Sequence, residues 1–313
     1  MRNIILHIGR SKTGTTSLQN FFYQNTEWLY NNGYEYPEIY RPKVAHHFLS
    51  RQFNRKALKS LTDTEIKKLI QDARNNILEN TTSDKTILFS SEGMQACNPK
   101  IIRRIFNEKY FNVKIVCYFR DQISFLSSSY TQGIHESFKT HHPEEYIRSA
   151  NPNYYEFISG WKNCFENLIV RNFSKKSLIN EDIVDDFLNQ VLSLRRPDKR
   201  IMNSNPSLSR RYLAFKLMLN KKHEEGSITI PKELNLYKLL GEVSRLDDSG
   251  KFMLSRLDAE YIFEKYEDSN KMFFSEYMPD ENIYKFDNNY IDQKFYDMTE
   301  NEFDNIYETL IGN

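Results

Sequence analysis

The sequence predicts an α/β fold with a central parallel sheet flanked by helices, followed by a mainly helical C-terminal part. Four short apolar runs rich in β-branched residues are typical of buried strands. These runs are Ile4–Ile8, Thr86–Ser90, Val113–Phe119 and Asn167–Arg171. Because helical segments separate the runs, a parallel sheet covered on both faces is favoured. We see no linker rich in Pro, Gly or Ser. We therefore expect one domain, 1–313, with an α/β core at 1–195 and a helical extension at 196–313.

Apolar residues at helical spacing mark the segments between and after these strands. The first expected helix starts at Thr15, and residues 34–40 are expected to be extended around Pro37. The other expected helices are Leu61–Leu78, Ile101–Phe106, Ile123–Ile134, Tyr154–Phe165, Ile183–Val191, Leu208–Leu219, Leu234–Leu246 and Asp258–Tyr266.

Three of the predicted strands end in residues that can do chemistry. The first ends at His7 and Ile8, the second runs into Ser90, Ser91 and Glu92, and the third ends at Arg120. Ligands of parallel sheets bind beyond the carboxyl ends of the strands. We therefore expect these three groups to lie along one edge of the sheet.

A loop bounded by Gly9 and Gly14 joins the first strand to the first helix. Loop N–H groups and a helix N-terminus together form a site for an anion such as phosphate. The loop differs from the P-loop pattern G-x-x-x-x-G-K-[ST], because Thr15 stands where that pattern has lysine. The lysine is Lys12, inside the loop, and the hydroxyls of Thr15 and Thr16 follow it.

Lys-Thr-Gly-Thr-Thr-Ser-Leu, after a strand that ends His-Ile-Gly, resembles the 5′-phosphosulfate loop of sulfotransferases that use 3′-phosphoadenosine 5′-phosphosulfate (PAPS). The closest likeness is to bacterial sulfotransferases related to carbohydrate sulfotransferases. The resemblance implies a P-loop-like fold. It also implies that the donor's 5′ end is bound by Arg10, Ser11, Lys12, Thr13, Gly14, Thr15, Thr16 and Ser17.

Arg120 and Ser128 form a second candidate anion site, since an arginine at a strand end can bind phosphate through two parallel hydrogen bonds. In sulfotransferases, an arginine at this place and a serine eight residues later bind the 3′-phosphate, and both positions match here. Ser127 and Ser129 are alternatives to Ser128. Without the Lys12 loop, a surface arginine and a solvated helix face would explain this pattern as well.

Glu92, His46 and His47 are candidates for the general base that would deprotonate an acceptor hydroxyl. Ser-Ser-Glu-Gly after the second strand resembles a segment of the bacterial family, in which the glutamate is a plausible catalytic residue. A histidine pair is also common in that family. The sequence does not choose between them. Glu92 can equally cap a helix N-terminus, and the histidines can equally be core or surface residues.

Asn203 and Ser207 lie in a polar, basic segment that follows Arg195 and Arg196. A comparable segment of the family precedes a late helix, which suggests contact with the adenosine or its 3′-phosphate. A serine N-cap with exposed arginines is the simpler explanation. The Arg-Lys-Gly-x-x-Gly loop of cytosolic sulfotransferases is absent, so the residues that bind adenine stay open.

The composition excludes several classes of protein. Lys+Arg 43 against Asp+Glu 42 leaves a net charge of +1, which gives no general attraction for nucleic acid. Three scattered cysteines without a C-x-x-C pair indicate reduced thiols and neither disulfides nor zinc. We see no signal peptide, and no run approaches the ~18 apolar residues of a membrane span. A cytoplasmic protein is expected.

The resemblance implies that a sulfuryl group moves from PAPS to an acceptor hydroxyl by in-line attack, without a metal. The acceptor class it suggests is a saccharide or glycoconjugate. Lys12 would stabilise charge on the bridging oxygen of the departing 3′,5′-bisphosphate. The alternatives are a P-loop kinase for a small molecule, which would lack its lysine after Gly14, and a nucleotide-binding protein without transfer activity.

Overall fold

A computed structural model describes residues 1–197, 208–231, 234–281, 284–287, 292 and 294–311. The chain divides into two compact units. We call the first the sheet unit, and it comprises Met1–Arg120, Asn153–Arg200 and Ser269–Ile283. We call the second the helical unit, and it comprises Asp121–Pro152, Ile201–Asp268 and Tyr284–Asn313. The units interleave along the chain, so the predicted division at residue 195 does not describe them.

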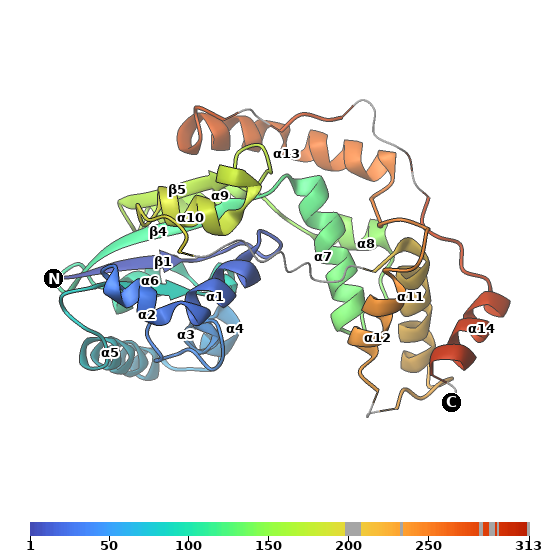
Figure 1. The fold of residues 1–313 in the computed structure, drawn as a ribbon, viewed down its shortest axis with the longest axis horizontal. Helices are drawn as coiled ribbons and strands as arrows, with labels where there is room; N and C mark the ends of the chain where they lie inside the picture. The colour runs from blue at the N-terminus through green and yellow to red at the C-terminus, as the bar shows by residue number, and fades with distance from the viewer. Residues whose placement is uncertain (198–207, 232–233, 282–283, 288–291, 293, 312–313) are drawn as a thin grey trace. The chain divides into compact units, whose positions relative to one another are not determined.

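The described residues of the sheet unit form a parallel sheet of five strands in the order β2-β3-β1-β4-β5. Figure 1 labels β1, β4 and β5. The strands are β1 Arg2–His7, β2 Tyr34–Glu35, β3 Thr86–Ser90, β4 Phe111–Phe119 and β5 Asn167–Asn172. Four of them match the predicted apolar runs. The fifth, β2, covers only the first two residues of the segment that we expected to be extended. The predicted fold class, a parallel sheet flanked by helices with a further helical part, is confirmed.

Strand β1 lies between β3 and β4, which places the three predicted strand ends side by side. His7 pairs with Ser90 of β3 on one side and with Val116 of β4 on the other. Strand β4 then continues to Phe119, so Arg120 lies about 13 Å further along the strand direction than His7. The expectation that the three groups share one edge of the sheet is therefore met.

Helices cover both faces of this sheet. Leu18 and Phe22 of α1 and Phe187 of α10 join one apolar cluster with β1, β3 and β4. On the other face, the ring of Phe89 contacts that of Phe106. The helices are α1 Thr15–Gln24, α2 Thr26–Asn31, α3 His47–Phe53, α4 Arg55–Leu58, α5 Asp63–Glu79, η1 Glu92–Ala96, α6 Pro99–Ile105, α9 Tyr154–Lys162, η2 Ile179–Glu181 and α10 Ile183–Gln190.

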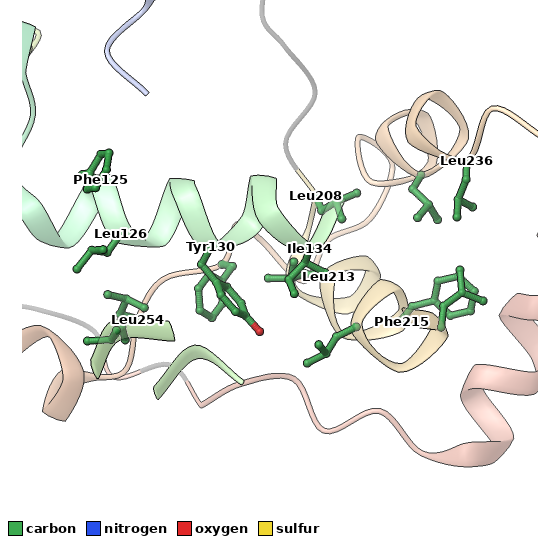
Figure 2. Packing of buried hydrophobic residues seen from close by; sticks show 14 of the residues in the cluster. Phe125, Leu126, Tyr130, Ile134, Leu208, Leu213, Phe215, Leu236 and Leu254 are labelled. Carbon is green, nitrogen blue, oxygen red and sulfur yellow. The ribbon is translucent and has the colours of Figure 1, made fainter. Parts of the chain in front are cut away.

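The helical unit packs around its own apolar core. Figure 2 shows Leu126, Tyr130 and Ile134 of α7 in one cluster with residues of α11 and with Leu254. The helices are α7 Gln122–Glu136, α8 Pro143–Ser149, α11 Arg210–Glu224, α12 Leu236–Val243 and α14 Glu300–Leu310. A further helix, α13 Arg256–Tyr277, belongs to this unit up to Asp268. None of the helices formed by the described residues has the length and apolarity that a membrane crossing requires.

Candidate active site

The loop between β1 and α1, which the sequence predicts to bind an anion, contains several residues with left-handed backbone conformation. Gly9, Lys12 and Gly14 all lie in the left-handed region, with φ of 52°, 67° and 70°. Left-handed residues within a turn point neighbouring N–H groups toward a common concavity. Gly14 is also the N-cap of α1, so the positive end of the helix dipole faces the same place.

Both glycines are needed where they stand, because their neighbours leave little room for a side chain. A Cβ atom on Gly9 would lie 3.0 Å from the Cα of Glu92. A Cβ on Gly14 would lie 3.0 Å from both Ile183 and Phe173. The loop is thus held against η1 on one side and against α10 and the end of β5 on the other.

Most of the loop amides remain available for an anion. Within the described part of the chain, no acceptor is hydrogen-bonded to the N–H groups of Ser11, Thr13, Gly14, Thr15 and Thr16. The first intrahelical bonds begin only with Ser17, whose N–H donates to the carbonyl of Gly14 at 3.0 Å. The hydroxyl of Thr13 closes the loop by donating to the carbonyl of Arg10 at 2.6 Å. These orphan donors and the small residues fit the phosphate end of a nucleotide.

Tyr154 of α9 connects this loop to the end of β4. Its ring lies under the guanidinium of Arg10, 5.3 Å from ring centre to Cζ. Its hydroxyl donates to the carbonyl of Arg120 at 2.7 Å. One buried side chain therefore touches both predicted anion-binding elements. Among the described residues, the half-buried guanidinium of Arg120 has neither a hydrogen bond nor an ion pair, so it can bind a phosphate.

Glu92 lies beside the loop and is held by Gln19, a residue that the sequence reasoning missed. The Nε2 of Gln19 donates to Oε2 of Glu92 at 2.7 Å. Gln19 follows Thr15 by one helical turn, on the buried face of α1. This spacing was the available signal, but it cannot by itself reveal a partner some seventy residues away. Glu92 remains 29% exposed and is accessible to a substrate.

His47 lies next to Glu92, whereas His46 does not. The Nε2 of His47 is 3.7 Å from Oε1 of Glu92, and its side chain is 31% exposed. His46 is fully buried, and both of its ring nitrogens bond to the backbone, one to Pro37 and one to Ser90. Burial lowers the pKa of His46 to about 3. The structure thus argues against His46 as the base and leaves Glu92 and His47 as candidates.

His7, at the end of β1, supports the strand end rather than facing the loop. Its ring is fully buried against Phe187 and Tyr118, and Nδ1 bonds to the hydroxyl of Ser90 at 2.8 Å. Burial lowers the pKa of His7 to about 3. The ring therefore stays neutral at physiological pH and packs the strand end from which the loop departs.

The other predicted binding residues lie outside the sheet unit or outside the described residues. Ser128 is on α7 in the helical unit. Its neighbours are already engaged, since Ser127 donates to the carbonyl of Ile123 and Ser129 accepts from Tyr146. Among the three serines, Ser128 is therefore the best candidate for an external ligand. Asn203 and Ser207 lie outside the described residues, so their roles stay predictions.

No group of three or more His, Cys, Asp or Glu side chains that could hold a metal occurs among the described residues. The expectation that the reaction needs no metal stays a prediction.

No family model matches the chain, but the chain is similar to individual known proteins. An uncharacterized protein of Archaeoglobus fulgidus is 29% identical over 204 residues, which are 63% of this chain and 55% of that protein. The chain thus spans about half the length of this relative. A crystal structure of a sulfotransferase from Alicyclobacillus acidocaldarius is similar with a TM-score of 0.42 and 18% identity, over 76% of this chain and 99% of the other.

Proposed function

We propose that this chain is a sulfotransferase that moves a sulfuryl group from PAPS to an acceptor hydroxyl, with a saccharide or glycoconjugate as the expected acceptor class. The observation that carries the proposal is the position of Tyr154, which contacts Arg10 of the loop and the backbone of Arg120. PAPS has an anion at each end of its ribose. Two anion-binding elements on one edge of the sheet suit such a molecule.

The donor would be held at two places. Residues 10–17 would bind the 5′ end through the loop amides and the hydroxyls of Thr15 and Thr16. Arg120 would bind the 3′-phosphate with two parallel hydrogen bonds. Ser128, Asn203 and Ser207 are the further ligands that the sequence resemblance implies.

When bound, PAPS supplies a sulfuryl group attached to a bisphosphate that can leave. Lys12 lies within the loop and would stabilise the negative charge that appears on the oxygen between phosphorus and sulfur. Glu92 or His47 would take the proton of the acceptor hydroxyl as that oxygen bonds to sulfur. Gln19 would keep the carboxylate of Glu92 oriented through its hydrogen bond.

The test is calorimetric binding of 3′,5′-bisphosphoadenosine, followed by transfer of labelled sulfate from PAPS to a panel of saccharides and other hydroxyl compounds. We expect the bisphosphate to bind without added magnesium and at least one acceptor to become labelled. The matched variants are Lys12→Ala in the loop and Lys68→Ala on the exposed face of α5. The proposal fails if the bisphosphate does not bind or if Lys12→Ala transfers as fast as Lys68→Ala.

Titrations with ATP and with the bisphosphate, together with the transfer assay, distinguish the alternative functions. A P-loop kinase would bind ATP in a magnesium-dependent way and would not need the 3′-phosphate. A binding protein without transfer activity would bind the bisphosphate and label no acceptor.

A further inference from the structure

The side chain of His47 is held on one side by two buried serines. Its Nδ1 lies 2.9 Å from the hydroxyl oxygen of Ser91. That oxygen is in turn 2.9 Å from the hydroxyl oxygen of Ser50, and it accepts the N–H of Gly93 at 3.2 Å. Ser50 and Ser91 are 3% and 0% exposed, so water does not compete for these bonds.

Counting protons along this chain of contacts fixes the tautomer of His47. The hydroxyl of Ser50 donates to the carbonyl of His47 at 3.0 Å, so its proton is used there. In the hydrogen bond between the two serines, the hydroxyl of Ser91 must therefore be the donor and that of Ser50 the acceptor. With that proton used, the bond between Ser91 and His47 needs a proton on Nδ1. This is the one assignment in which every contact has its proton, so neutral His47 has its lone pair on Nε2.

The other side of the ring faces Glu92. At 3.7 Å, Nε2 and Oε1 are too far apart for a hydrogen bond, so the lone pair of Nε2 stays free of Glu92 while the ring is neutral. Once Nε2 is protonated, the imidazolium lies beside the carboxylate and is stabilised by it. Gln19 holds Oε2 of the same carboxylate at 2.7 Å and keeps it in place.

We propose that Ser91 is a positioning residue that, together with Ser50, holds His47 as the Nδ1–H tautomer and so presents Nε2 as the general base. The inference rests on the proposed function, because it assigns the base of that reaction. The O–H bond of the acceptor breaks, its proton forms an N–H bond at Nε2 of His47, and the carboxylate of Glu92 balances the new charge. The Nδ1 proton does not move.

The tautomer can be measured without any substrate. Protein with ¹⁵N-labelled histidine is examined by NMR at a pH where His47 is neutral, and His47→Gln identifies its signals. We expect a protonated Nδ1 and an unprotonated Nε2 in the unaltered protein. In Ser91→Ala, the Nε2–H tautomer should become the main form. The matched control is Ser90→Ala. It removes an equally buried hydroxyl whose partners are His7 and Gln19 and not His47.

A second variant keeps the test decisive if Ser91→Ala does not fold. Ser50→Ala leaves the contact between Ser91 and His47 but frees the proton of Ser91, which can then donate to Nδ1. The population of the Nε2–H tautomer should therefore rise. The inference is overturned if the unaltered protein already has a protonated Nε2, or if neither variant changes the ring nitrogen shifts of His47.

The rate measurement follows once an acceptor is found. Ser91→Ala should lower kcat at least ~10-fold while the Kd of the bisphosphate stays within about 2-fold, because Ser91 does not touch the donor loop. An unchanged kcat would overturn the inference although the proposed function would stand. Failure of the bisphosphate to bind would overturn the proposed function although the tautomer would remain a property of the protein.

Discussion

The sheet unit and the helical unit both bury polar side chains, but these side chains support different neighbours. In the sheet unit, buried Gln19 and Ser91 bond to Glu92 and His47. The two residues that they hold are about 30% exposed and lie beside a loop with free amides. Burial of the supporting residues thus orients groups that a substrate can reach.

In the helical unit, Lys216 and Asn220 are two buried polar residues that bond to each other. The Nδ2 of Asn220 lies 2.8 Å from the carbonyl oxygen of Lys139 and 3.2 Å from that of Ser137. The ammonium of Lys216 donates to the side-chain oxygen of Asn220. The side chains of Lys216 and Asn220 thus serve backbone carbonyls just beyond the end of α7. They stabilise a helix end and give no indication of a substrate site.

The difference follows from the architecture of the two units. The parallel strands β3, β1 and β4 have their carboxyl ends on the same side of the sheet, which brings loops from distant parts of the chain to one edge. Packed helices must instead satisfy their own terminal carbonyls. The comparison predicts that substitutions in the sheet unit affect the rate of transfer and the stability at low pH. Substitutions in the helical unit should instead affect the stability at high pH.

The largest expected effect is a loss of stability of the sheet unit in acid. Burial lowers the pKa of His7 and His46 to about 3, against 6.5 in the unfolded chain. Below pH 6.5 the unfolded state therefore binds protons that the native state does not, and the free energy of unfolding falls. Between pH 6.5 and 5 the two residues together should remove about 3 kcal/mol.

Urea titrations followed by tryptophan fluorescence measure this loss, because both tryptophans, Trp28 and Trp161, belong to the sheet unit. His46→Gln should halve the decline. A free energy of unfolding that stays constant from pH 6.5 to 5 would show that the two rings are not buried as neutral bases.

The next effect is on catalysis. Lys12→Ala should lower the rate of transfer at least ~100-fold, or about 2.7 kcal/mol, because it removes the cation that stabilises the leaving group. The urea midpoint should change little. A near-normal rate of transfer would contradict the catalytic role of Lys12. A lower urea midpoint would show that Lys12 stabilises the fold instead.

Lys216 gives the helical unit the opposite pH dependence. Burial lowers the pKa of Lys216 to about 8, against 10.5 when unfolded. Above pH 8 the native state releases a proton that the unfolded state keeps, so the free energy of unfolding rises. The gain between pH 8 and 9.5 should be about 1.5 kcal/mol.

Amide hydrogen exchange, corrected for its intrinsic pH dependence, can follow this gain separately in α11 and in β4. Protection should rise in α11 and not in β4, and Lys216→Met should abolish the rise. An equal rise in protection in α11 and in β4 would contradict the idea that the two units respond separately to pH.

The smallest expected effect is that of Ser128, which the sequence resemblance implies as a ligand of the 3′-phosphate. Ser128→Ala should weaken the binding of 3′,5′-bisphosphoadenosine about 5-fold, or about 1 kcal/mol, the value of one ordinary hydrogen bond. Ser127→Ala is the matched control, since its hydroxyl already donates to Ile123. Equal Kd values for the two variants would remove Ser128 from the site.

Much of the sheet could be predicted because its central strands contain short apolar runs rich in β-branched and aromatic residues. The runs at Thr86–Ser90 and Val113–Phe119 are both strands. Strand β2 is only Tyr34–Glu35, too short to leave a pattern. Helix α3 begins at His47 without a side-chain cap, so its start had no signal in the sequence.

The glycine loop and the strand-end residues of the site were predictable from spacing, whereas the contacts between them were not. Two adjacent histidines look alike in a sequence, and only the start of α3 separates buried His46 from partly exposed His47. The links through Gln19, Ser91 and Tyr154 join segments distant in the chain. Such pairs depend on tertiary packing, which local patterns do not encode.

The central claim is that residues 10–17 of the loop and Arg120 bind the two ends of one nucleotide. It is tested most directly by titrating the unaltered protein and Arg120→Ala with 3′,5′-bisphosphoadenosine and with adenosine 5′-phosphate, with Arg103→Ala as the control. We predict that the unaltered protein prefers the bisphosphate, and that Arg120→Ala weakens its binding roughly 10- to 100-fold while adenosine 5′-phosphate is little affected. An equal loss for both ligands, or no preference in the unaltered protein, would contradict the account.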